Sequence, residues 1–122
     1  MKEGPVAPRR ILVVEDAPVI AMALQDMLED LGHEVVGPIG NMAVALEMAA
    51  AEALDAAVID INIRGGKIYP VARSLDARGI PFLLVSGYAD RSLPPDLIDR
   101  PRLEKPYTKE AIERQLRLLF DA

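Results

Sequence analysis

The chain has 122 residues, of which 51% are hydrophobic and 27% charged, and its formal net charge is −5 at pH 7. A chain of this length is expected to form one domain around a single core. The acidic balance and the lack of a basic run argue against nucleic-acid binding by the domain itself. Without cysteine there is no disulfide, thiolate metal site or thiol nucleophile, which fits a cytoplasmic location. No apolar run approaches the ~20 residues of a membrane-spanning helix.

The start of the chain and its histidine give few functional signals. Residues 1–8 lack the apolar core of a secretory signal and are expected to form a short flexible lead-in to a single domain over residues 9–122. His33 is the only histidine, so a histidine metal cluster and a Ser-His-Asp triad are poorly supported. Because His33 follows Gly32 in an expected helix-to-strand turn, we expect its side chain to be solvated.

Short apolar runs of strand length alternate with stretches of helical periodicity along the chain. The first expected strand leads to a helix that Asp16 can cap and that ends at Gly32. The second expected strand ends before Gly37-Pro38, and the next helix starts after Asn41. The strands expected in the sheet are residues 10–14, 34–36, 56–60, 81–86 and 101–104.

The second half of the chain continues this alternation. Arg64-Gly65-Gly66 is typical of a turn, and residues 68–78 have the periodicity of a helix. Residues 92–100 contain two adjacent prolines and can hold little more than a short helix. Thr108 is expected to cap the last helix. The pattern is therefore βα repeated five times, and right-handed crossovers make it a doubly wound α/β fold, a parallel sheet with helices on both faces.

Polar side chains stand where the expected strands end. They follow the first, third, fourth and fifth strands and are Glu15, Asp16, Asp60, Ser86 and Lys105. Because the carboxyl ends of parallel strands meet at one edge of a sheet, we expect these side chains to lie together. Adjacent carboxylates repel one another and favour a hard cation such as Mg²⁺, which binds oxygen ligands. A hydroxyl and an ammonium group can bind phosphoryl oxygens, so the set contains the groups that phosphoryl transfer requires.

In this order and on these elements, the residues resemble those of response-regulator receiver domains in two-component signalling, over residues 9–120. That family has an acidic pair after its first strand, a phosphoacceptor aspartate ending the third, and a residue two positions on whose backbone carbonyl binds Mg²⁺. A Thr or Ser on the fourth strand and a cis Lys-Pro pair complete the pattern. The matching residues are Glu15, Asp16, Asp60, Asn62, Ser86 and Lys105-Pro106. The resemblance implies a flavodoxin-like (βα)5 fold with strand order 2-1-3-4-5.

Two features depart from this pattern or narrow it. The aromatic residue that many receivers carry three positions before the lysine is Arg102 in this chain. Residues 81–88 are similar to the Pro-Phe-x-Phe-Ala-Thr-Gly-Tyr strand of the FATGUY receivers, a subgroup that is often single-domain, although residues 84–86 differ from it. The subgroup resemblance offers Tyr88 as an aromatic residue near the site.

The resemblance implies a phosphorylation-dependent signalling switch rather than an enzyme. Asp60 would accept a phosphoryl group from a sensor histidine kinase or a histidine phosphotransfer protein. The resemblance assigns the Mg²⁺ ligands to Glu15, Asp16, Asp60 and Asn62, and it assigns phosphoryl binding to Ser86 and Lys105. Since no output module follows in the sequence, the switch is expected to regulate a downstream protein partner, or to be one module of a longer chain.

Two other classes stay open. A pseudo-receiver keeps the fold as a protein-binding module without phosphorylation, and the complete set of site residues argues against it. A haloacid-dehalogenase-type phosphohydrolase also has its nucleophilic Asp at a strand end, but that family has a second Asp two residues on, where this chain has Asn62. Turnover of a free phosphoester would separate the phosphohydrolase from the switch.

Arg102 bears on how the signal would leave the site. Because burial of an unpaired guanidinium is costly, Arg102 is expected to stay outside rather than to fill an apolar cavity. The signal would then pass from Ser86 through Gly87 and Tyr88 into residues 90–100. A phosphoryl mimic such as beryllofluoride is therefore expected to change this stretch more than it changes Arg102.

Overall fold

A computed structural model describes residues 8–64, 66–87 and 93–121 of the chain. The described residues form a five-stranded parallel sheet in the order β2-β1-β3-β6-β7, with four helices and a small antiparallel pair, β4 and β5. The elements are β1 (Arg10–Val14), α1 (Pro18–Asp30), β2 (Glu34–Ile39), α2 (Met42–Ala51), β3 (Ala56–Asp60), β4 (Asn62–Ile63), β5 (Gly66–Lys67), α3 (Tyr69–Ala77), β6 (Phe82–Ser86), β7 (Arg102–Glu104) and α4 (Lys109–Asp121). Since β6 and β7 are the fourth and fifth strands of the parallel sheet, the predicted order 2-1-3-4-5 is confirmed.

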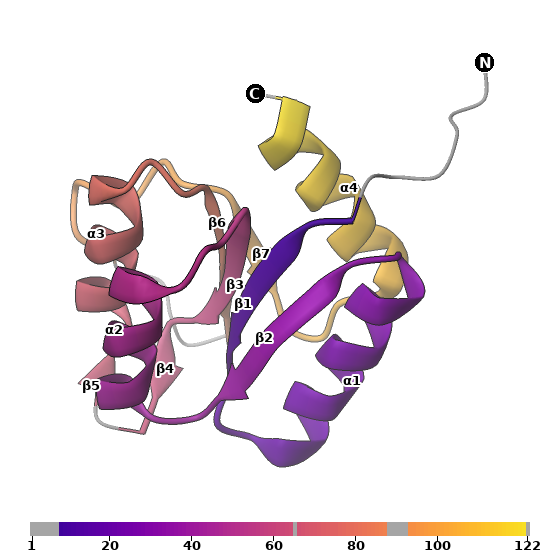
Figure 1. The fold of residues 1–122 in the computed structure, drawn as a ribbon, viewed down its shortest axis with the longest axis horizontal. Helices are drawn as coiled ribbons and strands as arrows, with labels where there is room; N and C mark the ends of the chain where they lie inside the picture. The colour runs from indigo at the N-terminus through magenta and orange to yellow at the C-terminus, as the bar shows by residue number, and fades with distance from the viewer. Residues whose placement is uncertain (1–7, 65, 88–92, 122) are drawn as a thin grey trace.

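Helices cover both faces of the sheet, with α1 and α4 on one face and α2 and α3 on the other (Figure 1). The strand side chains alternate between two apolar clusters, as a sheet buried on both faces requires. On β3, for example, Val58 packs towards α1 and α4, whereas Ile59 packs towards α2 and α3. None of the helices in the described residues has the length and apolar character needed to span a bilayer.

The helix starts only partly follow the predicted capping. Asn41 and Thr108 accept helix N–H groups through their side-chain oxygens, at 3.1 Å and 3.0 Å, and Thr108 was predicted to do so. The predicted cap at Asp16 is wrong, because the N-cap of α1 is Ala17 and no side chain caps it there. Instead the carboxylate of Glu15 accepts the N–H of Ala17 at 3.1 Å. The longer acidic side chain, one residue earlier, therefore holds the start of this helix.

The predicted end of the second strand is also wrong. β2 continues through Gly37 and Pro38 to Ile39. Gly37 has a φ of +107°, which favours glycine, and the register between β1 and β2 is irregular at this point. Because β2 lies at the edge of the sheet, a proline there breaks no interior ladder. The added length lets the carbonyl of Ile39 accept the N–H of Glu15 at 2.9 Å, which fixes the loop after β1.

The crossover between β6 and β7 stays within the predicted limit of a short helix at most. In its described part, residues 93–100, turns occupy residues 95–99, so the (βα)5 pattern has four helices within the described residues. Leu97 is completely buried against the α2 and α3 side of the core. Bidentate ion pairs tie the crossover to α3 and are Arg73–Asp96 and Arg100–Asp76, with shortest distances of 2.9 Å and 2.6 Å. Adjacent prolines disfavour a helix here, and these contacts hold the turns in place.

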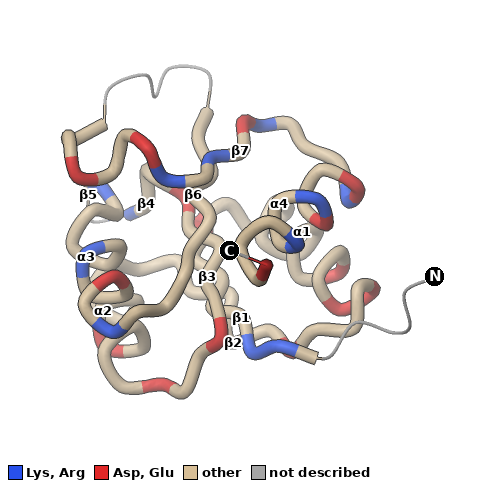
Figure 2. The backbone as a smooth tube through the Cα atoms, turned by 90° about the horizontal axis from the view of Figure 1, so that it is seen from above, with Lys and Arg blue, Asp and Glu red and all other residues tan. Residues whose placement is uncertain are grey.

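Charged residues connect the starts of neighbouring strands, and Figure 2 shows where Lys, Arg, Asp and Glu lie along the backbone. The guanidinium of Arg10 lies 3.2 Å from the carboxylate of Glu34 and 3.5 Å from that of Glu52, and it donates to the carbonyl of Ala53 at 2.6 Å. The backbone N–H of Arg10 donates to the carboxylate of Asp55 at 2.8 Å. Arg10 therefore connects the starts of β1, β2 and β3.

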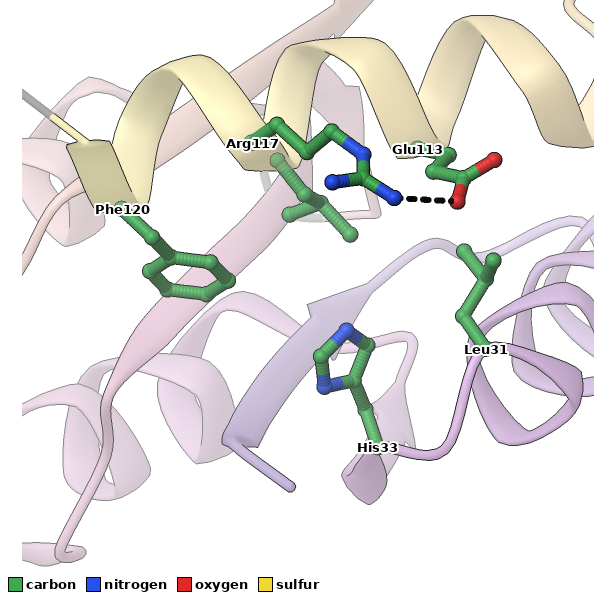
Figure 3. Close-up of a pocket in the computed structure, with 6 residues that line it drawn as sticks. Leu31, His33, Glu113, Arg117 and Phe120 are labelled. Atoms are coloured by element: carbon green, nitrogen blue, oxygen red, sulfur yellow. Dashed lines mark hydrogen bonds and ion pairs between the residues drawn. The ribbon is translucent and has the colours of Figure 1, made fainter. Parts of the chain in front are cut away.

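His33 lies at the same end, and the prediction that it is solvated is wrong. The residue is only 7% exposed, and its Nδ1 accepts the backbone N–H of Arg9 at 3.2 Å. Its ring points towards α4, where it lies beside Phe120 with 6.2 Å between ring centroids (Figure 3). A small cavity of about 50 Å³ separates the two elements and is lined by Leu31, His33, Glu113, Leu116, Arg117 and Phe120. The last turns of α4 cover His33. The residues of the local turn, from which solvation was predicted, carry no information about this distant helix.

Candidate functional site

Three of the predicted site residues form a buried charged cluster at the carboxyl edge of the sheet. Glu15 follows β1, Asp60 ends β3, and Lys105 follows β7. The Nζ atom of Lys105 lies 2.6 Å from Oδ2 of Asp60 and 3.1 Å from Oε1 of Glu15. The two carboxylate side chains are 6% and 2% exposed, respectively, and the lysine side chain is 24% exposed. One cation thus bridges two carboxylates that are almost completely removed from water.

Burial and mutual charge govern the protonation of this cluster. Burial raises the pKa of Glu15, and the neighbouring charge of Asp60 raises it further, against the lowering effects of the Ala17 N–H and Lys105. Burial alone would lower the pKa of Lys105, but hydrogen bonds to Asp60 and Glu15 outweigh it and raise this pKa above its usual value. Lys105 therefore stays a cation, and it is the main group that offsets the negative charge at the site.

The carboxylate of Asp60 is fixed on both of its oxygens. Oδ1 accepts the backbone N–H of Asn62 at 3.1 Å, and Oδ2 accepts Lys105. Asn62 belongs to β4, and its side-chain Oδ1 in turn accepts a hydrogen bond from Lys67 on β5. The sequence predicted only a turn at Arg64-Gly65-Gly66, because strands of two residues are too short to show a hydrophobic period. The hairpin holds the loop that follows Asp60.

Ser86 ends β6 beside this cluster. It is 1% exposed, and its Oγ has no hydrogen-bond partner among the described residues. Its backbone carbonyl accepts the N–H of Lys105 at 2.9 Å, so Ser86 also anchors the segment that carries the lysine. A buried hydroxyl without a partner is uncommon in folded proteins and is available to a ligand placed at this edge.

The predicted acidic ligands are not all brought together. Asp16 is half-buried beside Gly40, and the side chain of Asn62 is exposed. Across residues 8–64, 66–87 and 93–121, no group of three His, Cys, Asp or Glu side chains is arranged to hold a metal ion. The donors that are present are of the kind that Mg²⁺ prefers, because they are carboxylate oxygens. The two buried carboxylates also outnumber the one ammonium group that lies between them.

The predicted switch residues are placed as follows. Arg102 lies on β7 opposite Leu84 and is exposed. Gly87 is half-buried directly after β6, whereas Tyr88 lies outside the described residues. The route of the signal through these residues stays a prediction.

Tyr107 is a residue of this region that the sequence analysis did not single out. Its hydroxyl is buried and has no hydrogen-bond partner in the described part of the chain. Burial, followed by the negative charge of Glu15, raises the pKa of Tyr107 to about 12. Its position, directly after Lys105-Pro106, was the one signal that could have drawn attention to it.

Comparison with known proteins identifies the class of this chain. Residues 11–117 match the family model of the response regulator receiver domain, and the chain belongs to this family. The predicted resemblance and the fold are therefore confirmed.

Among curated proteins, the chain is similar to the transcriptional regulatory protein PdtaR of Mycobacterium tuberculosis, with 31% identity over 78% of this chain and 45% of PdtaR. It is also similar to the phyllosphere-induced regulator PhyR of Methylorubrum extorquens, with 30% identity over 68% of this chain and 32% of PhyR. The chain thus spans less than half the length of these curated relatives.

Among solved structures, SdrG from Sphingomonas melonis Fr1 is 43% identical, with a TM-score of 0.83 over 93% of this chain and 97% of SdrG. A second SdrG structure, in the BeF3-activated conformation, has a TM-score of 0.76 over 90% of this chain and 94% of that one. The receiver domain of the sensor histidine kinase PA1611 from Pseudomonas aeruginosa PAO1, which has magnesium in its active site cleft, shares the fold at 22% identity and a TM-score of 0.77, covering 95% of this chain and all of that one.

Proposed function

We propose that this receiver domain accepts a phosphoryl group on Asp60 from a sensor histidine kinase or a histidine phosphotransfer protein, and changes conformation to regulate a protein partner. The observation that carries the proposal is the bridge from Lys105 to the buried carboxylates of Asp60 and Glu15. Such a buried carboxylate at a strand end, with an ammonium group 2.6 Å away, has both a nucleophile and a donor for phosphoryl oxygens.

In the transfer, one oxygen of Asp60 attacks the phosphorus atom of the phosphohistidine, the phosphorus–nitrogen bond breaks, and the imidazole leaves with the bonding electrons. Lys105 binds a phosphoryl oxygen, and the hydroxyl of Ser86, which has no partner among the described residues, binds another. The N–H of Asn62 keeps the carboxylate of Asp60 oriented. Attack of water on the acyl phosphate later resets the domain, so the domain turns over only its own phosphoryl group.

Mg²⁺ is part of this proposal. Its ligands would be the carboxylates of Glu15, Asp16 and Asp60 and the backbone carbonyl of Asn62, and the ion would neutralise charge on the phosphoryl group. The magnesium recorded in the receiver domain of PA1611 supports this assignment as an analogy within the same fold.

Output through protein contacts is proposed from the relatives. PdtaR and PhyR are described as regulators, and both extend well beyond the aligned region. SdrG, which is similar over almost its whole length, is recorded in a BeF3-activated conformation. We propose that this chain likewise responds to phosphorylation by changing a protein surface, in the cytoplasm where histidine kinases present their phosphohistidine.

The test is phosphorylation of Asp60. Wild type, Asp60→Asn and the control Asp55→Asn are treated with acetyl phosphate or a kinase, with Mg²⁺ and with a chelator, and their intact masses are measured. We expect one phosphoryl group on wild type and on Asp55→Asn, none on Asp60→Asn, and little uptake in chelator. Equal uptake by Asp60→Asn would exclude Asp60 as the acceptor, and no uptake by wild type from any donor would favour a pseudo-receiver.

A further inference from the structure

The side chain of Asn62 begins beside the carboxylate of the acceptor aspartate. The N–H of Asn62 donates to Oδ1 of Asp60 at 3.1 Å. Because the side chain branches from the atom next to this nitrogen, it starts within a few ångströms of the carboxylate. Asp60 is only 4% exposed, whereas Asn62 is exposed. The amide of Asn62 is therefore close to any water that approaches a phosphoryl group on Asp60 from this side.

The hairpin of β4 and β5 places Lys67 opposite Asn62 (Figure 1). The two residues are paired in the antiparallel register, and Nζ of Lys67 donates to Oδ1 of Asn62. Side chains directly opposite each other in such a pair lie on one face of the hairpin and within reach of each other. Asn62 and Lys67 are both exposed, whereas Ile63, the next residue of β4, is buried. The contact thus belongs to the solvent-facing side of the hairpin.

The backbone of this hairpin is fixed by contacts other than the side chain of Lys67. Ile61 and Ile68, which flank the hairpin, are completely buried, and the N–H of Ile68 donates to the carbonyl of Ile61 at 2.8 Å. The N–H of Ile61 donates to the carbonyl of Val85 on β6 at 2.9 Å. Loss of the Lys67 side chain should therefore free the amide of Asn62 and leave its backbone in place, including the carbonyl proposed to bind Mg²⁺.

An amide oxygen that is free to turn can assist the step that resets the domain. In hydrolysis, the oxygen of a water molecule attacks the phosphorus of the acyl phosphate, the bond between phosphorus and the Asp60 oxygen breaks, and its electrons stay on the carboxylate. Both water protons end on the released dihydrogen phosphate. A side-chain amide can orient such a water by accepting one of its O–H groups. The hydrogen bond from Lys67 instead holds the amide oxygen of Asn62 on the hairpin.

We propose that Lys67 is a positioning residue that prolongs the lifetime of the phosphorylated state, because it keeps the amide of Asn62 away from the attacking water. The inference rests on the proposed function, since it requires an acyl phosphate on Asp60. The effect of Lys67 runs through Asn62, so it disappears when the amide is removed. Contacts between two exposed side chains are weak, so the rate of hydrolysis changes a few-fold and phosphorylation itself persists.

The experiment is a double-mutant cycle on hydrolysis of the acyl phosphate. Wild type, Lys67→Met, Asn62→Ala and the double variant are phosphorylated with acetyl phosphate or a kinase and Mg²⁺, freed of donor, and followed by intact mass. We expect Lys67→Met to lose its phosphoryl group about threefold faster than wild type. Asn62→Ala and the double variant should lose it at equal rates, because Lys67 then has no amide to hold. Lys109→Met, which removes an exposed lysine of α4, is the control and should match wild type.

A conservative variant and a spectroscopic readout separate this role from a general effect of charge or stability. Lys67→Arg keeps a donor for the amide and should hydrolyse at the wild-type rate. In ¹⁵N spectra, the side-chain amide signals of Asn62 should shift in Lys67→Met, while its backbone N–H signal stays in place.

Unchanged or slower hydrolysis in Lys67→Met would overturn the inference, and so would fast hydrolysis in Lys67→Arg. An effect of Lys67→Met that persists in the Asn62→Ala background would show that Lys67 does not act through the amide, and would overturn it as well. Failure of wild type itself to take up a phosphoryl group from any donor would instead contradict the proposed function, and the role of Lys67 would fall with it.

Discussion

The two ends of the sheet handle polar groups in opposite ways. At the amino ends, Arg10 is half-buried and distributes its contacts over several acceptors, while His33 is buried as a neutral ring with a backbone donor on Nδ1. At the carboxyl ends, Glu15 and Asp60 are both buried and share the single cation of Lys105. The amino end therefore spreads its charges over half-buried and exposed side chains, whereas the carboxyl end concentrates two carboxylates inside.

The difference shows which part of the fold contains groups that destabilise the folded state. Buried like charges and unpaired hydroxyls are destabilising, and both occur at the carboxyl edge, with Ser86 and Tyr107 as the hydroxyls. At the amino edge, charged residues instead connect neighbouring strands through ion pairs and hydrogen bonds. Donors that the protein leaves unsatisfied are available to a ligand at the carboxyl edge, whereas the buried Nε of Arg9 at the amino edge lies in a guanidinium stacked over Phe120.

The largest expected effect is at the carboxyl edge. Lys105→Met should lower the free energy of unfolding by about 3 kcal/mol, because it leaves Glu15 and Asp60 buried without a cation. Lys109→Met is the control, since Lys109 makes an exposed 3.7 Å pair with Asp30 and should cost under about 1 kcal/mol. Urea unfolding of both variants measures the two losses. Equal losses of unfolding free energy in the two variants would show that Lys105 is not needed to offset the buried charge of Glu15 and Asp60.

A smaller loss is expected at the amino edge. Arg10→Ala should cost about 1 kcal/mol, because its exposed ion pairs are individually weak and the hydrogen bond to the carbonyl of Ala53 adds a modest amount. Arg114→Ala is the control, since Arg114 is exposed on α4 and forms no ion pair with the residues that the structure describes. If urea unfolding gave Arg10→Ala a loss as large as that of Lys105→Met, the contrast between the two ends would not hold.

The smallest effect is a pH dependence of opposite sign at the two ends. Burial, with a contribution from Arg9, lowers the pKa of His33 below its ordinary 6.5, so below that pH the unfolded chain binds the proton more readily. The free energy of unfolding should therefore fall between about pH 7 and about pH 5, by up to about 1 kcal/mol, as the Arg9 N–H loses its acceptor. Glu15, whose pKa burial raises above 4.5, has the opposite effect, because its protonation favours the folded chain.

His33→Gln isolates the histidine in this experiment. The glutamine carbonyl can accept an N–H but does not titrate, so the fall in unfolding free energy should be smaller in this variant than in wild type. Urea unfolding at the two pH values gives the comparison. The same fall in both proteins would assign the pH dependence to other groups.

The sequence predicted the position of a site residue correctly where that position depends only on the strand that carries the residue. Asp60 and Ser86 close apolar runs that could only be buried strands, so their meeting at one edge followed from parallel topology. Lys105 was placed at the same edge by the order of the elements. The contact of Lys105 with both Glu15 and Asp60 could not be derived in this way, because spacing gives no side-chain direction.

The failures share a physical origin in contacts between distant segments. The burial of His33 depends on α4, which lies far along the chain from it. The extension of β2 through Pro38 depends on its place at the sheet edge, and the turns at residues 95–99 depend on ion pairs with α3. Local propensity describes none of these contacts, so the predicted strand end and the predicted solvated histidine were wrong.

The crossover at residues 93–100 has a consequence for how the domain responds to its solution. Its ties to α3 are ion pairs between half-exposed side chains, and its described part contains no helix whose backbone hydrogen bonds would have to break when it moves. Dissolved ions weaken such exposed pairs most at about 1 M salt, where the Debye length falls to about 3 Å and becomes comparable with the pair distances. Buried Leu97 is then the main remaining anchor. We therefore expect the freedom of this segment to rise with ionic strength.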